Sequence, residues 1–132
     1  MKSFHSKGFT LVEIMIVVAI IALLAAIAIP NLLRAKLNAN DALAKATIRA
    51  VSTASESYAV TNNGNYPLNV TSLTGASPAF LNTPFYCGVT ISGYTYTCTF
   101  TISSYAIAAT PVTIGSSGTT TLTISTGGVI SP

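Results

Sequence analysis

Charge is the scarcest property of this sequence. Only 7% of its 132 residues are Asp, Glu, Lys or Arg, whereas an ordinary soluble protein has roughly 25%. None of these residues lies beyond Glu56, and the only histidine is His5. The second half of the chain therefore lacks a general base, a cluster of metal ligands and a catalytic triad. We expect no enzyme, no metal site and no cofactor.

The positive charge is too dispersed to predict a nucleic-acid partner. The net charge is +3, and the basic residues beyond the leader are spread along one segment that also contains Asp41 and Glu56. A nucleic-acid interface requires Lys and Arg side chains gathered on one face. We therefore predict no direct contact with nucleic acid.

What the sequence does contain is one long apolar run. It extends from Phe9 to Ile29 with only Thr10 and Glu13 as polar exceptions, and about 20 such residues suffice to cross a bilayer as a helix. A short polar leader, residues 1–8, precedes it. Two lysines in this leader favour a cytoplasmic N-terminus. The sequence therefore predicts a single membrane span.

An amphipathic pattern follows the apolar run. Pro30 lacks an N–H group and could break a helix, but the helical periodicity continues to about Val60. The predicted apolar face contains Leu37, Ala44, Ile48, Val51, Ser55 and Tyr58, and the predicted polar stripe contains Arg34, Asn38, Asp41, Lys45, Arg49, Ser52 and Glu56. Asparagine and glycine at 62–64 are typical of a helix end. We expect one helix from Phe9 to about Val60, kinked near Pro30.

A hairpin is the clearest strand signal. In FYCGVTISGYTYTCTF, residues 85–100, a two-residue turn at Ser92-Gly93 places Cys87 opposite Cys98 and the large apolar side chains on one face. Two cysteines are too few for a metal site, and this register predicts a disulfide between them in an oxidising compartment.

Further strands are expected at 104–109 and 120–125, with a glycine turn at 127–128 before 129–130. The predicted fold class is α+β, with a long kinked N-terminal helix packed on a small antiparallel β-sheet.

Glu13 raises a question of its own. A carboxylate at the bilayer centre costs roughly 2.5–3.5 kcal/mol, and less near an interface, yet no cation lies deep in the apolar run of the same chain. If the chain were cut after Gly8, Phe9 would acquire a free amine at a similar depth. In a stack of staggered copies, Glu13 of one copy could pair with the Phe9 amine of the next.

The stretch Gly8-Phe9-Thr10-Leu11-Val12-Glu13, followed by an apolar helix with Pro30, resembles the cleavage and assembly signature of type IV prepilins and of the related pseudopilins of type II secretion. The resemblance implies that a prepilin peptidase cuts between Gly8 and Phe9, and that Phe9 is then N-methylated. It also implies that Phe9 and Glu13 serve filament assembly and that Pro30 kinks the helix.

The resemblance divides the chain into four parts. These are the leader at 1–8, a transmembrane and assembly half of the helix at 9–30, an amphipathic half at 31–61 and a β-sheet head at 62–132. The implied partners are other copies of the chain, the peptidase and N-methyltransferase, an assembly platform, minor pilins and, before assembly, the inner membrane. The implied final location is a pilus on the cell surface, serving adhesion, motility or DNA uptake.

Several alternatives stay open. The chain could be a pseudopilin, although its head lacks the acidic residues that bind calcium in major pseudopilins. Ala26-Ile27-Ala28 has the form that signal peptidase accepts, which would release a soluble periplasmic binding domain. The run could also be a plain anchor in which Glu13 reaches toward the interface. Asn69 begins an Asn-Val-Thr pattern and is a candidate glycosylation site.

Overall fold

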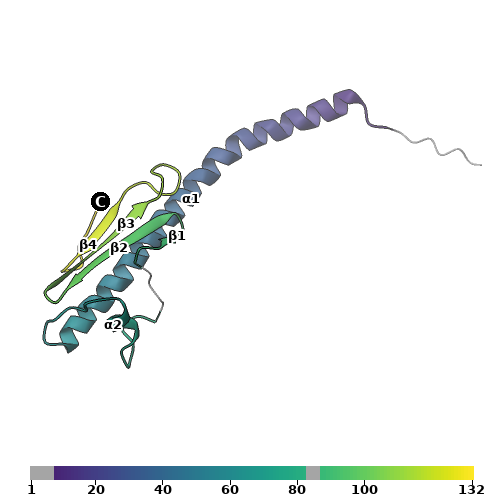
Figure 1. Ribbon diagram of the computed structural model, residues 1–132. Helices are drawn as coiled ribbons and strands as arrows, with labels where there is room; N and C mark the ends of the chain where they lie inside the picture. Colours follow the sequence, from purple (N-terminus) through teal and green to yellow (C-terminus); the bar gives the residue numbers. More distant parts are fainter. Residues whose placement is uncertain (1–7, 83–86) are drawn as a thin grey trace, which may run out of the picture. The chain divides into compact units, whose positions relative to one another are not determined.

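The described residues form a long helix and a small antiparallel sheet, as the sequence predicted, and the sheet has five strands (Figure 1). This computed structural model describes residues 8–82 and 87–132. Helix α1 spans Leu11–Thr61 and helix α2 spans Thr71–Thr74. The strands are β1 (Thr90–Ile91), β2 (Tyr94–Thr101), β3 (Ser104–Pro111), β4 (Leu122–Ser125) and β5 (Ile130–Ser131). The described residues divide into two compact units, one up to Ala35 and one from Lys36 onward.

The sheet is an antiparallel meander in the order β1-β2-β3-β4-β5. The predicted turn at Ser92-Gly93 is confirmed, because Ile91 pairs with Tyr94 across it. Both turn residues have positive φ angles, 48° and 81°, as a type I′ hairpin turn requires. The glycine pair at 127–128 likewise connects β4 to β5.

The hairpin departs from the prediction before β1. The N–H groups of Gly88 and Tyr96 donate to Tyr96 O and Val89 O at 2.5 and 3.3 Å, so two residues face one. This is a bulge that begins with a glycine at positive φ. The predicted uninterrupted ribbon from Phe85 is therefore wrong at Gly88 and Val89, and Val89 is 45% exposed instead of facing the core. Phe85 lies outside the described residues.

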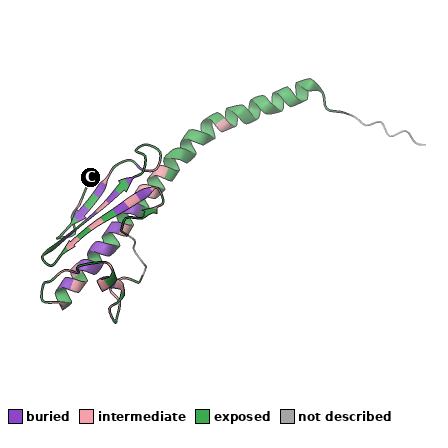
Figure 2. Ribbon diagram, in the orientation of Figure 1, coloured by how far each residue is buried: buried purple, intermediate pink, exposed green. Residues whose placement is uncertain are grey.

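The core of the second unit lies between α1 and one face of the sheet (Figure 2). The predicted apolar face of α1 is confirmed: Ala44, Ile48, Val51 and Ser55 are buried, and Leu37 and Tyr58 are half-buried. The strands contribute their alternate side chains, and the largest of these are Tyr94, Tyr96, Tyr105, Ile107 and Ile124. Their intervening residues, chiefly threonines, face away from α1.

Ser52 corrects the predicted polar stripe. Its side chain is buried, with only 3% of its surface exposed, because its hydroxyl and that of Tyr105 form a hydrogen bond of 2.7 Å. A hydroxyl can be buried at small cost when it finds such a partner. The predicted stripe therefore contains one residue of the core.

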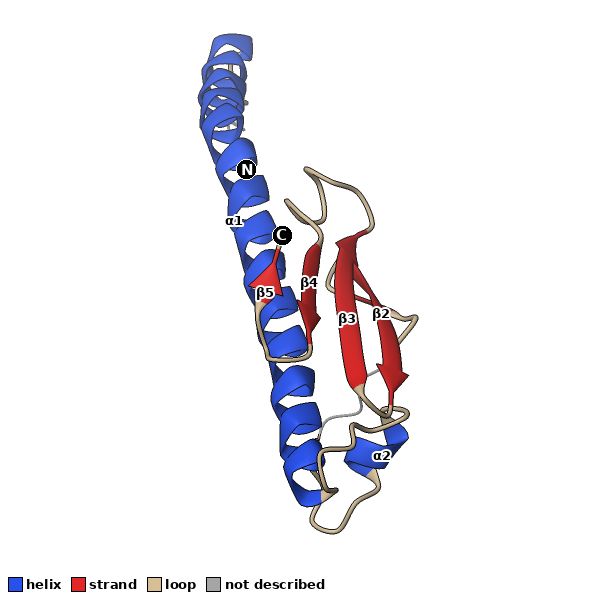
Figure 3. Cartoon of the chain, turned by 90° about the vertical axis from the view of Figure 1, so that its left-hand side faces the viewer, coloured by secondary structure: helices blue, strands red, loops and turns tan. Residues whose placement is uncertain are grey.

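The connection between α1 and the sheet contains a short helix that the strand-like composition did not predict. Figure 3 shows α2 beside the chain that leaves the end of α1. Leu73 of α2 is fully buried, and the ring of Phe80 meets that of Tyr58 edge to face at 5.5 Å between centroids. This connection closes the end of the core.

Candidate processing, assembly and anchoring residues

The predicted cleavage residues lie just before the helix. Gly8, Phe9 and Thr10 precede the first helical residue, Leu11. Phe9 is 84% exposed, and a Cβ added at Gly8 would meet no atom within 4 Å. The peptide bond between them is therefore sterically open, although cleavage itself stays a prediction.

Glu13 has a partner within its own chain. The N–H and hydroxyl groups of Thr10 both donate to Glu13 Oε2 at 2.8 Å, and the Glu13 N–H donates to the Thr10 hydroxyl at 3.2 Å. This reciprocal arrangement is a capping box, which supplies side-chain acceptors to N–H groups that have no backbone acceptor within the helix. Sequence reasoning missed the role of Thr10, although Thr-x-x-Glu before an apolar run is its local signal.

The capping box leaves part of the carboxylate available. Both bonds from Thr10 converge on Oε2, and within the described residues no hydrogen bond reaches Oε1. The helix start therefore holds Glu13 in one orientation while one oxygen can still accept from a donor outside the chain. Pairing with a neighbouring Phe9 amine is compatible with this geometry and stays a prediction.

The apolar stretch of α1 is exposed to solvent in the part of the chain that the structure describes. Its large aliphatic residues are at least 44% exposed up to Leu33, and the helix continues through Pro30. By length and composition this stretch can cross a membrane. A kink at Pro30 stays a prediction.

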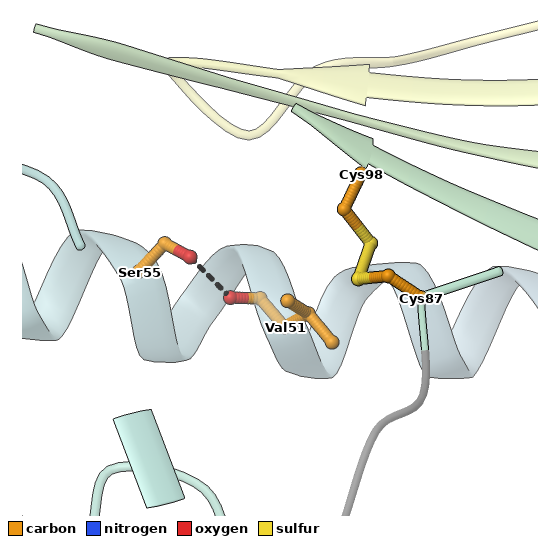
Figure 4. Close-up of a disulfide and its surroundings, with 4 residues drawn as sticks. All are labelled: Val51, Ser55, Cys87 and Cys98. Carbon is orange, nitrogen blue, oxygen red and sulfur yellow. Dashed lines mark hydrogen bonds between the residues drawn. A yellow bond between two sulfur atoms is a disulfide. The ribbon is translucent and has the colours of Figure 1, made fainter. Parts of the chain in front are cut away.

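Cys87 and Cys98 form a disulfide, with Cα atoms 5.6 Å apart. Figure 4 shows that it joins β2 to the segment before β1 on the side of the sheet that faces α1. Because the bulge follows Cys87 directly, the bond fixes the end of the hairpin where the strand ladder stops.

Asp41 anchors the loop between β3 and β4 to α1. Its Oδ1 accepts from the Tyr94 hydroxyl at 2.7 Å and from the Thr119 N–H at 3.1 Å, and its Oδ2 accepts from the Thr119 hydroxyl. The Asn40 side chain adds a bond of 2.8 Å to Ser117 O. Partial burial tends to raise the pKa of Asp41, but these hydrogen bonds outweigh it and lower the pKa.

Tyr94 is held in place from two sides. Burial, and then its hydrogen bond to Asp41, raise its pKa to about 12, so its hydroxyl remains a donor near neutral pH. Gly118 lies against the ring so closely that no side chain would fit there. A glycine at position 118 is thus required by packing.

Glu56 anchors the opposite end of the sheet. Its carboxylate accepts from the hydroxyls of Tyr66 and Tyr105 at 2.9 Å each and from the Gly127 N–H at 3.0 Å. Burial would raise its pKa, but the bonds from Gly127 and the tyrosines lower it. Burial is the main cause that raises the pKa of Tyr105 to about 12. Sequence reasoning placed both carboxylates on a polar stripe and missed these contacts.

Asn69 has a structural role. Its side-chain oxygen accepts from the Ser72 N–H at 2.9 Å and from the Ser72 hydroxyl at 3.0 Å, which ties the segment before α2 to the first turn of this helix. Asn69 is exposed. Its glycosylation stays a prediction.

The chain resembles known proteins over part of its length. Residues 3–29 match the family described as the prokaryotic N-terminal methylation motif. The chain is 49% identical over 59 residues to the type IV wide pilus major component PilA4 of Thermus thermophilus, which covers 45% of each chain. It is 49% identical over 54 residues to the type IV major pilin protein PilA of Myxococcus xanthus, covering 41% of this chain and 24% of that one.

A secretion protein is also similar. The type II secretion system core protein G of Aeromonas hydrophila is 37% identical over 67 residues, covering 51% of this chain and 46% of that one. The chain thus spans less than half the length of each of these relatives. No solved structure matches it significantly.

The helix and sheet, the methylation motif and the pilin relatives agree with one another. Over the part that these comparisons match, the chain is similar to type IV pilins and to a core protein of type II secretion.

Proposed function

We propose that the chain is a structural subunit of a type IV pilus. The observation that carries this proposal is the exposed apolar stretch of α1, which begins with a capped glutamate one turn after Gly8-Phe9. Within the described residues nothing buries this surface, so it requires first a bilayer and then neighbouring copies. The two relatives that are 49% identical are named as a major component of a type IV pilus and as a type IV major pilin.

The proposed life cycle begins in the inner membrane, with the N-terminus in the cytoplasm. A prepilin peptidase removes residues 1–8, and Phe9 is N-methylated. An assembly platform then moves the subunit into a helical homopolymer with minor pilins. Residues 9–30 pack in the filament centre, 31–61 join them to the head, and 62–132 form the surface.

Assembly needs the charges at the helix start to cancel. Cleavage would give Phe9 an ammonium group, and a charge in a nearly dry filament core is heavily penalised unless it is paired. Glu13 of a neighbouring copy supplies the opposite charge through the oxygen that Thr10 leaves available. The capping box keeps this carboxylate oriented before the neighbour arrives.

A pseudopilin is the second candidate, favoured by the similarity to core protein G of type II secretion. The two are separated by the structure that the protein builds. Native surface fibres should be sheared from cells, and their main protein identified by mass spectrometry. Abundant fibres made of this chain, starting at Phe9, support a pilin.

Other results would reject the proposal. A mature protein that starts at Ile29 would establish a secretory signal cut after Ala28. A chain that starts at Met1 in assembled fibres would exclude leader cleavage. Fibres absent from the surface, with the mature chain required for release of secreted proteins, would favour the pseudopilin.

A further inference from the structure

The loop between β3 and β4 presents apolar side chains at one end of the sheet. Val112 and Ile114 are 61% and 72% exposed, and residues 112–121 contain no charged side chain. Two large aliphatic side chains on one short exposed loop form a small apolar patch of the kind that marks contact sites.

This loop is held in place, so it cannot fold back to cover the patch. Asn40 and Asp41 of α1 bind Ser117 and Thr119. Within the loop, the Thr113 N–H donates to Ser117 Oγ at 2.9 Å, and the Ser117 N–H returns a bond of 2.9 Å to Thr113 O. The exposure of the two apolar side chains is therefore a property of an ordered loop.

The loop lies at the end of the sheet nearest the start of the second unit. Tyr105, at the beginning of β3, contacts Ser52, whereas Tyr94, which pairs with Pro111 at the end of β3, contacts Asp41. β3 therefore runs opposite to α1. The chain leaves β3 toward the N-terminal end of this part of α1 (Figure 3).

The length of chain before Asn40 limits how far the loop can lie from the predicted membrane span. Leu33, the last large apolar residue before the charged segment, lies 40 − 33 = 7 positions before Asn40. Seven residues span about 24 Å at most and about 10 Å as a helix. The polar headgroup layer on one side of a bilayer is itself roughly 5–8 Å thick. Exposed Lys36 lies within this stretch.

We propose that residues 112–118, together with Lys36, contact the surface of an anionic phospholipid bilayer while the subunit is still in the membrane. Val112 and Ile114 enter the boundary between headgroups and acyl chains, and the Lys36 ammonium pairs with lipid phosphate. Asp41, the nearby anionic side chain in this unit, already accepts hydrogen bonds from Thr119 and Tyr94. The contact holds the head at the bilayer until assembly lifts it away.

The inference rests on the proposed function in one respect, the membrane span, and the experiment tests that separately. The full-length chain is reconstituted in vesicles of mixed phosphatidylethanolamine and phosphatidylglycerol, and resistance to alkaline extraction reports the span. An environment-sensitive fluorophore is placed on Ser116→Cys in the loop or, as a matched control, on Ser103→Cys at the opposite end of β3. Both serines are exposed, and the native cysteines are already bonded to each other.

A lipid carrying a shallow quencher should reduce the fluorescence at position 116 several-fold more than at position 103. Ile114→Asp should reduce the quenching at 116 to the level seen at 103. Ile102→Asp, an equal change at an exposed residue of the opposite turn, should leave it unaltered.

Each other outcome counts against one claim. Extraction of the chain from the vesicles would reject the membrane span and with it the proposed function. Retention with equal quenching at both positions would overturn the loop contact alone. If phosphatidylcholine vesicles quench the fluorescence at position 116 as strongly as the vesicles that contain phosphatidylglycerol, the assignment of an anionic lipid partner is overturned.

Discussion

The two parts of α1 use the same kinds of side chain in opposite surroundings. Ile21 in the first part is 59% exposed, whereas Ile48 in the second part is fully buried. Both are isoleucines in one continuous helix, but Ile21 lies in the continuous apolar run and Ile48 lies on the apolar face of the amphipathic stretch. The difference is that the sheet covers one face of the second part. Apolar surface in the first part stays available for a bilayer or for other subunits.

The largest effect should come from breaking the charge pair proposed for the first part. Glu13→Ala should abolish filaments, because an unpaired buried ammonium costs about 3–5 kcal/mol in every subunit. Cleaved subunit should still accumulate in the membrane. Microscopy of surface fibres and the amount of processed subunit would measure the two effects.

Glu13→Gln separates charge from helix capping. Glutamine can still complete a capping box with Thr10, so the helix start should be retained while the charge is lost. We expect far fewer fibres than in the wild type. Wild-type yield from this variant would show that capping, rather than charge, is what assembly requires.

Matched truncations test the second part. Ile48→Ala should lower the free energy of unfolding of the head by about 2–5 kcal/mol, because it opens a cavity in a packed core. Ile21→Ala removes the same atoms from an exposed site and should leave head unfolding unchanged. Thermal unfolding in detergent, followed by near-UV circular dichroism, would compare them. Equal destabilisation would mean that the two parts do not differ as described.

Removing the disulfide should have a smaller effect on the head. Cys87 and Cys98 are 11 positions apart, and closing so short a loop contributes about 2–3 kcal/mol in the chain-entropy model. The double variant Cys87→Ser and Cys98→Ser should lose that amount in denaturant unfolding. Leader cleavage at the N-terminus should be unaffected. Loss of cleavage in this variant would show that processing of the first part depends on the stability of the head.

The smallest effect should come from the carboxylate anchors. Glu56→Gln should cost about 1–2 kcal/mol, since neutral hydrogen bonds replace charge-assisted ones on a partly exposed group. The folded pKa of Glu56 lies below its ordinary value of 4.5. Its contribution is therefore complete above pH 4.5 and declines as the pH falls through the lower, folded value.

Unfolding measured between pH 7 and pH 3 would show this decline in the wild type. The slope should be shallower in Glu56→Gln, and Asp41→Asn should behave in the same way, because the pKa of Asp41 is also lowered. An unchanged slope in both variants would show that these carboxylates do not link head stability to pH.

Local signals in the sequence predicted the helix, the turn at Ser92-Gly93 and the alternation of the strands, because each depends on residues close together in the chain. The anchors of Asp41 and Glu56 were not predictable in this way. Their partners Thr119 and Gly127 lie 78 and 71 positions away, and a carboxylate on a helix is usually solvated.

Three other features that were not predicted from the sequence have different causes. The bulge at Gly88 inserts one extra residue into its strand and bends it locally. The alternation of apolar and polar residues does not reveal such an insertion. Ser52 is buried only because Tyr105 meets it from a distant strand. Thr10 differs from these, since its capping pattern with Glu13 is local and could have been found.

The outer face of the sheet is polar but uncharged, because its threonines face away from α1. After Glu56 no side chain carries a formal charge near neutral pH, and β2 presents Thr97, Thr99 and Thr101 to the outside. Such a surface is hydrated through hydroxyl groups and is not protected from its neighbours by electrostatic repulsion. Contacts between heads should therefore respond little to ionic strength, because screening acts only on charges. Fibres built from these subunits should associate side by side to the same extent in dilute and in saline water.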